Sequence, residues 1–222
     1  FSAAEVRNTS WRDLKNTPRE VKAIVDLAGG DAFMGKQASK QAFIDHASSY
    51  KILHLAMHAY TRDENPLFSS LVFAEEKEES YLYISDIYTL QLQAELAVLS
   101  ACNTGVGKWL KGEGVMSLAR AFRYAGCPSI AMSLWQADDK ATREIMTLFY
   151  QALYTGQEKD KALRIAKQSY LKQTGRAHPH YWSAFVLVGE QAAIGEGQDG
   201  FGMWVWVVLG CLLLGIAWFA SS

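Results

Sequence analysis

The sequence predicts an α/β domain with a largely parallel sheet flanked by helices, followed by a C-terminal transmembrane helix. The domain is predicted because short apolar runs, typical of buried strands, alternate with segments of helical period that can serve as crossovers between parallel strands. The transmembrane helix is predicted because a long uncharged apolar run lies near the end of the chain. Half of the 222 residues are apolar and a fifth are charged, so the chain can bury a substantial core.

The N-terminal half contains two amphipathic helices, one strand and one hairpin. The predicted ranges are a helix over 15–27, a helix over 39–46, a strand over 52–57 and a hairpin of 71–74 with 81–84. Gly29 and Gly30 end the first helix, and Ser39 is placed to cap the second. The acidic run over 75–79 predicts a solvated turn in the hairpin.

The C-terminal half continues the alternation of strand and helix. The predicted ranges are a strand over 95–102, a helix over 114–125, a strand over 127–135, a helix from about 139 to 154, a helix over 160–172 and a strand over 182–188. Gly126 ends the first of these helices, and Cys127 is interpreted as a core residue. His178 and His180 flank a proline and are interpreted as turn residues.

The C-terminal region separates into a polar connector and an apolar segment. No Lys or Arg occurs over 177–222, and the run over 201–220 is uncharged. Twenty residues of helix reach about 30 Å, which matches the hydrocarbon thickness of a bilayer. Trp204, Trp206 and Trp218 lie near its ends, where bilayer interfaces favour tryptophan. Because buried core helices are seldom uncharged for this long, we predict a transmembrane helix over 202–220. The chain then divides into a domain over 1–190, a connector over 191–201 and this helix.

The charge balance and the cysteine count exclude two classes of protein. With 22 Lys and Arg against 23 Asp and Glu, and no local basic patch, a nucleic-acid partner is not expected. Three cysteines are too few for a disulfide framework, so the context of each thiol decides its role.

Two reactive side chains follow strand ends in the predicted sheet. His58 closes the strand over 52–57, and Cys102 closes the strand over 95–102. The carboxyl ends of parallel strands form the crevice where ligands bind, and a thiol there becomes a competent thiolate when a histidine lies close. Lone buried cysteines and histidines more often serve only packing, but Cys102 leads into the polar turn over 103–105. We therefore predict a catalytic dyad of His58 and Cys102.

Two other motifs are weaker. His54 and His58 form an H-x-x-x-H pair, but it lacks the glutamate of the metallopeptidase motif and lies in a predicted strand. We interpret His54 as a structural neighbour of His58, because residues four apart on a strand share a face. The glycines over 105–114 match neither the dinucleotide-binding pattern nor the P-loop pattern. Neither a metal nor an organic cofactor is expected.

Four segments together resemble a known family. They are ILHLAMHA, LAVLSACNTGVG, GEGVMSLARAFRYAGCPSIAMSLWQADD and HPHYWSAFVLVGE. Over about residues 11–189 the chain resembles the CHAT domain, a branch of the caspase-like cysteine peptidases often found behind tetratricopeptide repeats. The resemblance implies a caspase and separase type of fold with its dyad on His58 and Cys102. It also implies that backbone N–H groups of Ala59 and Cys102 form the oxyanion hole, although family members commonly carry glycine where this chain has Ala59.

The loop over 133–139 resembles the family segment that borders the S1 pocket. A carboxylate there would receive a basic side chain at the substrate position P1. Asp139 also fits the N-cap of a helix that starts at Lys140, a role that aspartate fills well. We favour the cap for Asp139 and retain Asp138 as the S1 candidate.

The sequence therefore predicts a membrane-anchored, caspase-like cysteine endopeptidase that acts on a protein or peptide substrate. Because the chain starts on Phe1, we expect upstream sequence, where the resemblance implies tetratricopeptide repeats or a sensor partner that regulates activity. The alternative is a non-cleaving regulatory or protein-interaction module with a caspase-like fold, and a third class is acyl transfer to a small substrate. The presence of both dyad residues favours the peptidase.

The charges around the predicted span assign no orientation, because both flanks lack Lys and Arg. A catalytic thiolate is safer in a reducing cytoplasm, whereas an upstream secretion signal would permit an extracytoplasmic domain. We expect a single-pass protein of a bacterial inner membrane with the peptidase domain in the cytoplasm.

Overall fold

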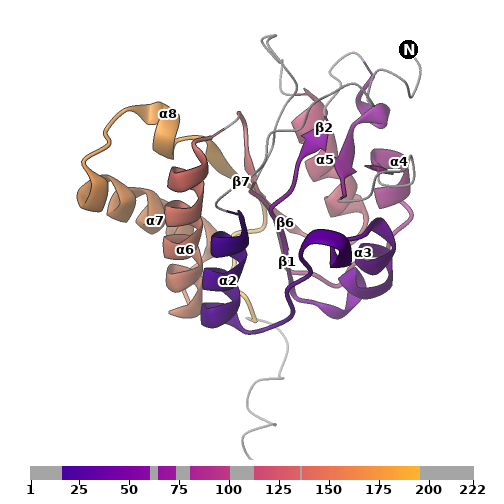
Figure 1. Ribbon diagram of the computed structural model, residues 1–222, viewed down its shortest axis with the longest axis horizontal. Helices are drawn as coiled ribbons and strands as arrows, with labels where there is room; N and C mark the ends of the chain where they lie inside the picture. The colour runs from indigo at the N-terminus through magenta and orange to yellow at the C-terminus, as the bar shows by residue number, and fades with distance from the viewer. Residues whose placement is uncertain (1–16, 61–64, 74–80, 101–112, 136, 196–222) are drawn as a thin grey trace, which may run out of the picture.

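The computed structural model describes residues 17–60, 65–73, 81–100, 113–135 and 137–195. Its helices are α2 (Thr17–Ala28), α3 (Lys40–His46), α4 (Ile84–Ile87), α5 (Glu113–Tyr124), α6 (Asp139–Tyr154), α7 (Lys159–Thr174) and α8 (Pro179–Trp182). Its strands are β1 (Ile52–Leu55), β2 (Ala59–Tyr60), β3 (Ser70–Val72), β4 (Tyr81–Tyr83), β5 (Leu96–Leu99), β6 (Ser129–Ser133) and β7 (Phe185–Gly189). Figure 1 shows a central sheet with α2, α6 and α7 on one side and α3, α4 and α5 on the other.

The main sheet has the strand order β1-β5-β6-β7. The first three strands are parallel, and β7 pairs with β6 in the antiparallel sense. Leu55 at the end of β1 lies beside Leu99 of β5, which lies beside Met132 of β6. The carboxyl ends of the three parallel strands therefore meet at one edge. The prediction of a largely parallel sheet flanked by helices is confirmed.

The core lies on both faces of β5. Leu96 and Val98 pack on the side of α2, α6 and α7, whereas Ala97 and Leu99 pack on the side of α5 and the second sheet. All four side chains are buried. A continuous apolar run is typical of a parallel strand that is covered on both faces.

A second sheet of order β2-β3-β4 is antiparallel throughout. Its β3 and β4 form the predicted hairpin, with Leu71 paired to Leu82. The two-residue strand β2 was not predicted, because so short a strand carries no periodic signal. It starts directly after His58, so the chain passes from the main sheet to the second sheet at that residue.

Several predicted helix ends are confirmed by local geometry. The Ser39 hydroxyl accepts the Ala42 N–H at 3.1 Å and caps α3. Gly126 follows α5 with a φ of +110°, a value that L side chains rarely adopt. A Cβ atom at Gly126 would also collide with the carbonyl oxygen of Leu92, so only glycine fits this turn.

The last strand starts later than predicted. The helix α8 occupies Pro179–Trp182, and β7 begins only at Phe185. The reason is Pro179, whose fixed φ suits the first position of a helix. His178, predicted in a turn, is the N-cap of α8: its Nδ1 atom accepts the N–H of His180, which lies inside the helix.

None of the helices in the described ranges is both long and apolar enough to cross a membrane. The predicted transmembrane helix over 202–220 and the end of the connector, 196–201, lie outside those ranges. So does the predicted acidic turn over 75–79.

Candidate active site

His58 lies where the chain leaves the main sheet. It lies three residues after Leu55, the last residue of β1, and directly precedes β2. Its carbonyl oxygen accepts the N–H of Val72 at 2.9 Å, which fixes the backbone of His58 to β3. The side chain is half-buried, and its Nδ1 atom is shielded from solvent. The imidazole is therefore held at the edge where the parallel strands end.

The peptide N–H of Ala59 points away from β3. In a trans peptide the carbonyl of one residue and the N–H of the next point in opposite directions. Because the His58 carbonyl points to Val72 of β3, the Ala59 N–H is directed to the opposite side. Ala59 itself is buried, at 2% exposure. This orientation suits a donor to an oxyanion.

Cys102 lies outside the described residues, and so do the glycines over 105–112. The strand that leads to Cys102 is described, and the Ser100 N–H donates to the Leu55 carbonyl at 3.2 Å. The pairing of β5 with β1 thus continues to within two residues of Cys102. Contact between Cys102 and His58 stays a prediction.

His54 has a different role, four residues before His58. Its Nε2 atom lies 3.0 Å from Glu20 Oε1 of α2, and its Nδ1 atom lies 3.1 Å from Tyr150 Oη of α6. Glu20 is only 1% exposed, and burial, with a smaller effect of the Glu20 charge, raises the pKa of Tyr150. Both ring nitrogens are engaged, so the prediction that His54 is structural is confirmed.

Sequence reasoning missed the partners of His54. Glu20 and Ile24 are spaced four apart and are the two buried residues of α2. A carboxylate on the apolar face of an amphipathic helix is a signal of a buried polar partner. No comparable signal points to Tyr150.

Cys127 is buried in the core, as predicted. Its thiol donates to the Ser129 carbonyl at 3.3 Å. Burial raises the pKa of Cys127 to about 11, and this hydrogen bond only partly opposes the effect. A thiol in this state is a poor nucleophile at neutral pH.

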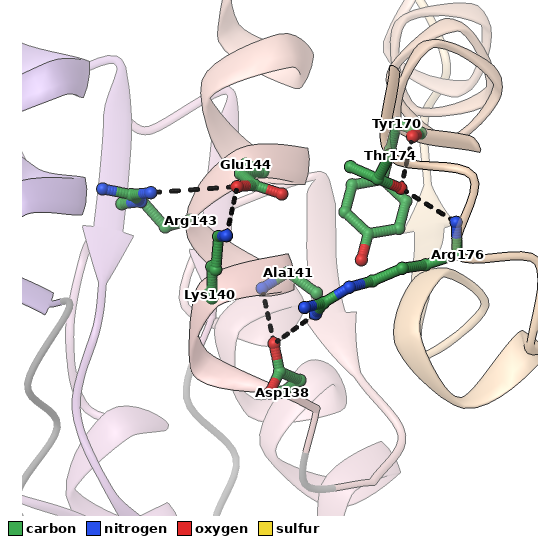
Figure 2. Close-up of polar contacts among 8 residues, drawn as sticks. All are labelled: Asp138, Lys140, Ala141, Arg143, Glu144, Tyr170, Thr174 and Arg176. Atoms are coloured by element: carbon green, nitrogen blue, oxygen red, sulfur yellow. Dashed lines mark hydrogen bonds and ion pairs between the residues drawn. The ribbon is translucent and has the colours of Figure 1, made fainter. Parts of the chain in front are cut away.

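The predicted N-cap at Asp139 is wrong by one residue. Asp138 has an extended backbone, and its carboxylate accepts the Ala141 N–H at 2.9 Å, so Asp138 caps α6 (Figure 2). Asp139 is the first helical residue. Arg176, which sequence reasoning did not single out, lies with Nη1 3.7 Å from Asp138 Oδ1. Asp138 follows β6 and therefore lies at the same edge of the sheet as His58.

Within the described ranges, no group of three or more His, Cys, Asp or Glu side chains could hold a metal ion. The buried pair of Glu20 and His54 offers a single carboxylate and one imidazole, which already bind each other.

Comparison with known proteins identifies the family. Residues 1–190 match the family model of the CHAT domain. The chain belongs to the CHAT domain family. This CHAT chain is 23% identical over 226 residues to tetratricopeptide repeat protein 28 of Homo sapiens, and 22% identical to the Mus musculus protein of that name. Each alignment covers 86% of the CHAT chain but 9% of the relative.

The fold of this CHAT domain is similar to that of a solved structure. The crystal structure of the Arg-specific cysteine proteinase gingipain R resembles it with a TM-score of 0.50 and 8% sequence identity. The match covers 83% of this chain and 43% of that chain. The chain therefore shares the α/β fold of that proteinase. The predicted family and the predicted α/β domain are confirmed, whereas the transmembrane helix over 202–220 stays a prediction.

Proposed function

We propose that this CHAT domain is the catalytic part of a cysteine endopeptidase that uses His58 and Cys102. The register of β1 and β5 carries the proposal, because Leu55 and Leu99 are partners on these strands. His58 follows Leu55 by three residues, and Cys102 follows Leu99 by three. Neighbouring strands lie about 4.8 Å apart, so equal offsets favour a side-by-side placement of imidazole and thiol.

The reaction is an acyl transfer through a thioester. His58 takes the proton of the Cys102 thiol, and the thiolate attacks the carbonyl carbon of the scissile peptide bond. The bond from that carbon to nitrogen breaks as His58 returns the proton to the leaving amine. Water then hydrolyses the thioester, which releases the new carboxylate and restores the thiol. The N–H groups of Ala59 and Cys102 hold the oxyanion, and each such donor contributes about 3 kcal/mol in studied hydrolases.

Regulation by upstream sequence is part of the proposal. The two curated relatives are named as tetratricopeptide repeat proteins, and the matched region is 9% of their length. This supports upstream tetratricopeptide repeats as the region that senses a signal or partner. A peptidase under such control is inactive until the upstream region changes state.

We also propose that the segment over 202–220 anchors the protein in a membrane, with the CHAT domain in the cytoplasm. The Gly195 N–H donates to Glu95 Oε2 at 2.8 Å, just before β5 begins. The described chain therefore ends at the edge of the sheet opposite to His58, and an anchor there would direct the active edge away from the bilayer. Release of the full chain by carbonate extraction would refute the anchor. Modification of Cys102 by an impermeant thiol reagent on intact cells would refute the cytoplasmic side.

The decisive experiment compares the thiols of Cys102 and Cys127 as a matched pair. Cys102→Ala should abolish peptide cleavage and labelling by a peptide-based thiol probe. Cys127→Ala should keep both, because the Cys127 thiol is buried and its pKa is about 11. Unchanged cleavage by Cys102→Ala would refute the proposal. No cleavage by the wild-type protein, with or without its upstream region, would favour a non-cleaving regulatory module.

A further inference from the structure

A cavity lies at the edge of the main sheet opposite to His58. Its volume is about 550 Å³, within the range of small-molecule sites. The amino ends of the three parallel strands line it, because Lys51 precedes β1, Glu95 precedes β5 and Pro128 comes just before β6. Lys159, the first residue of α7, also lines it. The cavity is therefore separate from the candidate active site.

Lys159 places a buried amino group beside this cavity. The residue is only 2% exposed, and its backbone N–H donates to the Gln191 carbonyl at 2.8 Å, which fixes the start of α7 to the segment after β7. In the part of the chain that the structure describes, its side chain forms no hydrogen bond or salt bridge. A buried ammonium without a partner is unfavourable, so such a group tends to lose its proton.

The surroundings of Lys159 favour the neutral amine. Burial lowers the pKa of the Lys159 ammonium, while the charges of Glu95 and Glu190 and, last, that of Cys127 oppose this effect. The effect of burial is the larger one. At neutral pH more of this amine is unprotonated than in an exposed lysine, and the unprotonated form is the nucleophile.

The two carboxylates beside the cavity differ in what they bind. Glu95 is engaged on both oxygens, because Oε1 lies 3.1 Å from Lys51 Nζ and Oε2 accepts the Gly195 N–H at 2.8 Å. Glu190 lines the same cavity, and its negative charge acts on Lys159. A cation formed at Lys159 is therefore favoured by Glu190, whereas a bound anion would be repelled by it.

We propose that Lys159 is a nucleophilic amine that forms an imine with a small aldehyde or ketone bound in this cavity. The amine nitrogen forms a bond to the carbonyl carbon, and the carbonyl oxygen leaves as water with the two amine protons. The imine then takes up a proton and becomes the cation that Glu190 favours. Ser48, Ser49 and Gln93 also line the cavity and suit a carbonyl compound that carries hydroxyl groups.

The first test maps adducts of glycolaldehyde on the full chain. Sodium cyanoborohydride reduces the imines that form at neutral pH, and peptide mass spectrometry locates them. Lys159 should be labelled faster than Lys161, whose side chain is 47% exposed and pairs with Glu158 at 2.9 Å. The rate at Lys159 should level off as the aldehyde concentration rises, because the aldehyde binds before it reacts. The rate at Lys161 should rise in proportion to the concentration. Labelling in the order of exposure, with Lys159 last, would overturn the inference.

Matched variants identify the amine. Lys159→Arg should lose the fast, saturable adduct, because a guanidinium keeps its proton and forms no such imine. Lys161→Arg should keep it. The wild-type mapping stays decisive if Lys159→Arg fails to fold. Binding of inorganic phosphate that protects Lys159, with no adduct at this residue, would also overturn the inference and make the cavity an anion site. None of these readouts depends on peptide cleavage, so the inference stands or falls apart from the proposed peptidase.

Discussion

One histidine lies within β1 and another lies three residues beyond its carboxyl end, and the two rings have different surroundings. In the middle, α2 and α6 cover the strand, and both nitrogens of His54 bind buried groups of those helices. At the end, the chain turns into the second sheet, and His58 lies half-buried where the parallel strands finish. The same residue type thus serves the core in one place and the candidate active site in the other.

The two histidines therefore differ in their surroundings, and on the proposed function they also differ in role. Residues four apart on a strand share a face, so the sequence spacing alone makes His54 and His58 look equivalent. Helices cover the interior of a parallel sheet and force polar side chains there to find internal partners. The carboxyl edge of a parallel sheet is where ligands commonly bind, and His58 lies there between the main sheet and the second sheet.

The largest expected effect comes from the histidine at the edge. His58→Ala should lower kcat/KM for peptide cleavage by about 10² to 10⁴, because the thiol of Cys102 loses its general base. The free energy of unfolding should change by less than about 1 kcal/mol, since the side chain is half-buried at the end of a strand. Kinetics and urea unfolding of the same preparation measure both quantities. A fully active variant would remove His58 from the chemistry.

The opposite pattern is expected for the histidine in the middle. His54→Ala should destabilise the fold by about 3 kcal/mol, because the carboxylate of Glu20, 1% exposed, loses its partner. At a temperature where the variant stays folded, kcat/KM should match the wild type.

A matched variant separates the buried charge from the lost packing. The double variant Glu20→Gln with His54→Ala should recover part of the stability, because no buried charge is left unpaired. Loss of activity in a stable His54 variant would mean that both histidines take part in catalysis, and the contrast between them would disappear.

The main sheet and most helices could be predicted from the sequence, because these elements depend on local periodicity. Strand β5 was predictable because its apolar run is continuous, and α5 because Gly126 marks its end. The strand β2 was not predictable, because two residues carry no period. The start of α8 was missed, because its aromatic residues resemble a strand although Pro179 favours a helix.

The candidate site was predictable only in part, for a physical reason. His58 was found because it ends a strand, a feature that the sequence itself displays. The contacts of His54 with Tyr150, and of Asp138 with Arg176, join residues that lie far apart in the chain. Tertiary packing creates such pairs, and neither partner has a local pattern that names the other. The contact of His58 with Cys102 also remains a prediction, because Cys102 lies outside the described residues.

The smallest expected effect concerns the cap of α6 at the active edge. Asp138→Ala should lower the free energy of unfolding by about 1 kcal/mol, because the Ala141 N–H at the helix start loses its acceptor. Asp139→Ala should cost only about 0.3 kcal/mol, the value of a negative charge in the first turn of a helix. Asp138→Ser should retain most of the stability, since the serine hydroxyl can accept the same N–H. Midpoints of urea unfolding distinguish the three variants. If Asp139→Ala were the costlier change, the cap of α6 would lie one residue later, at Asp139. The expected order instead makes Asp138 a side chain at the active edge with a structural role, which His58 lacks.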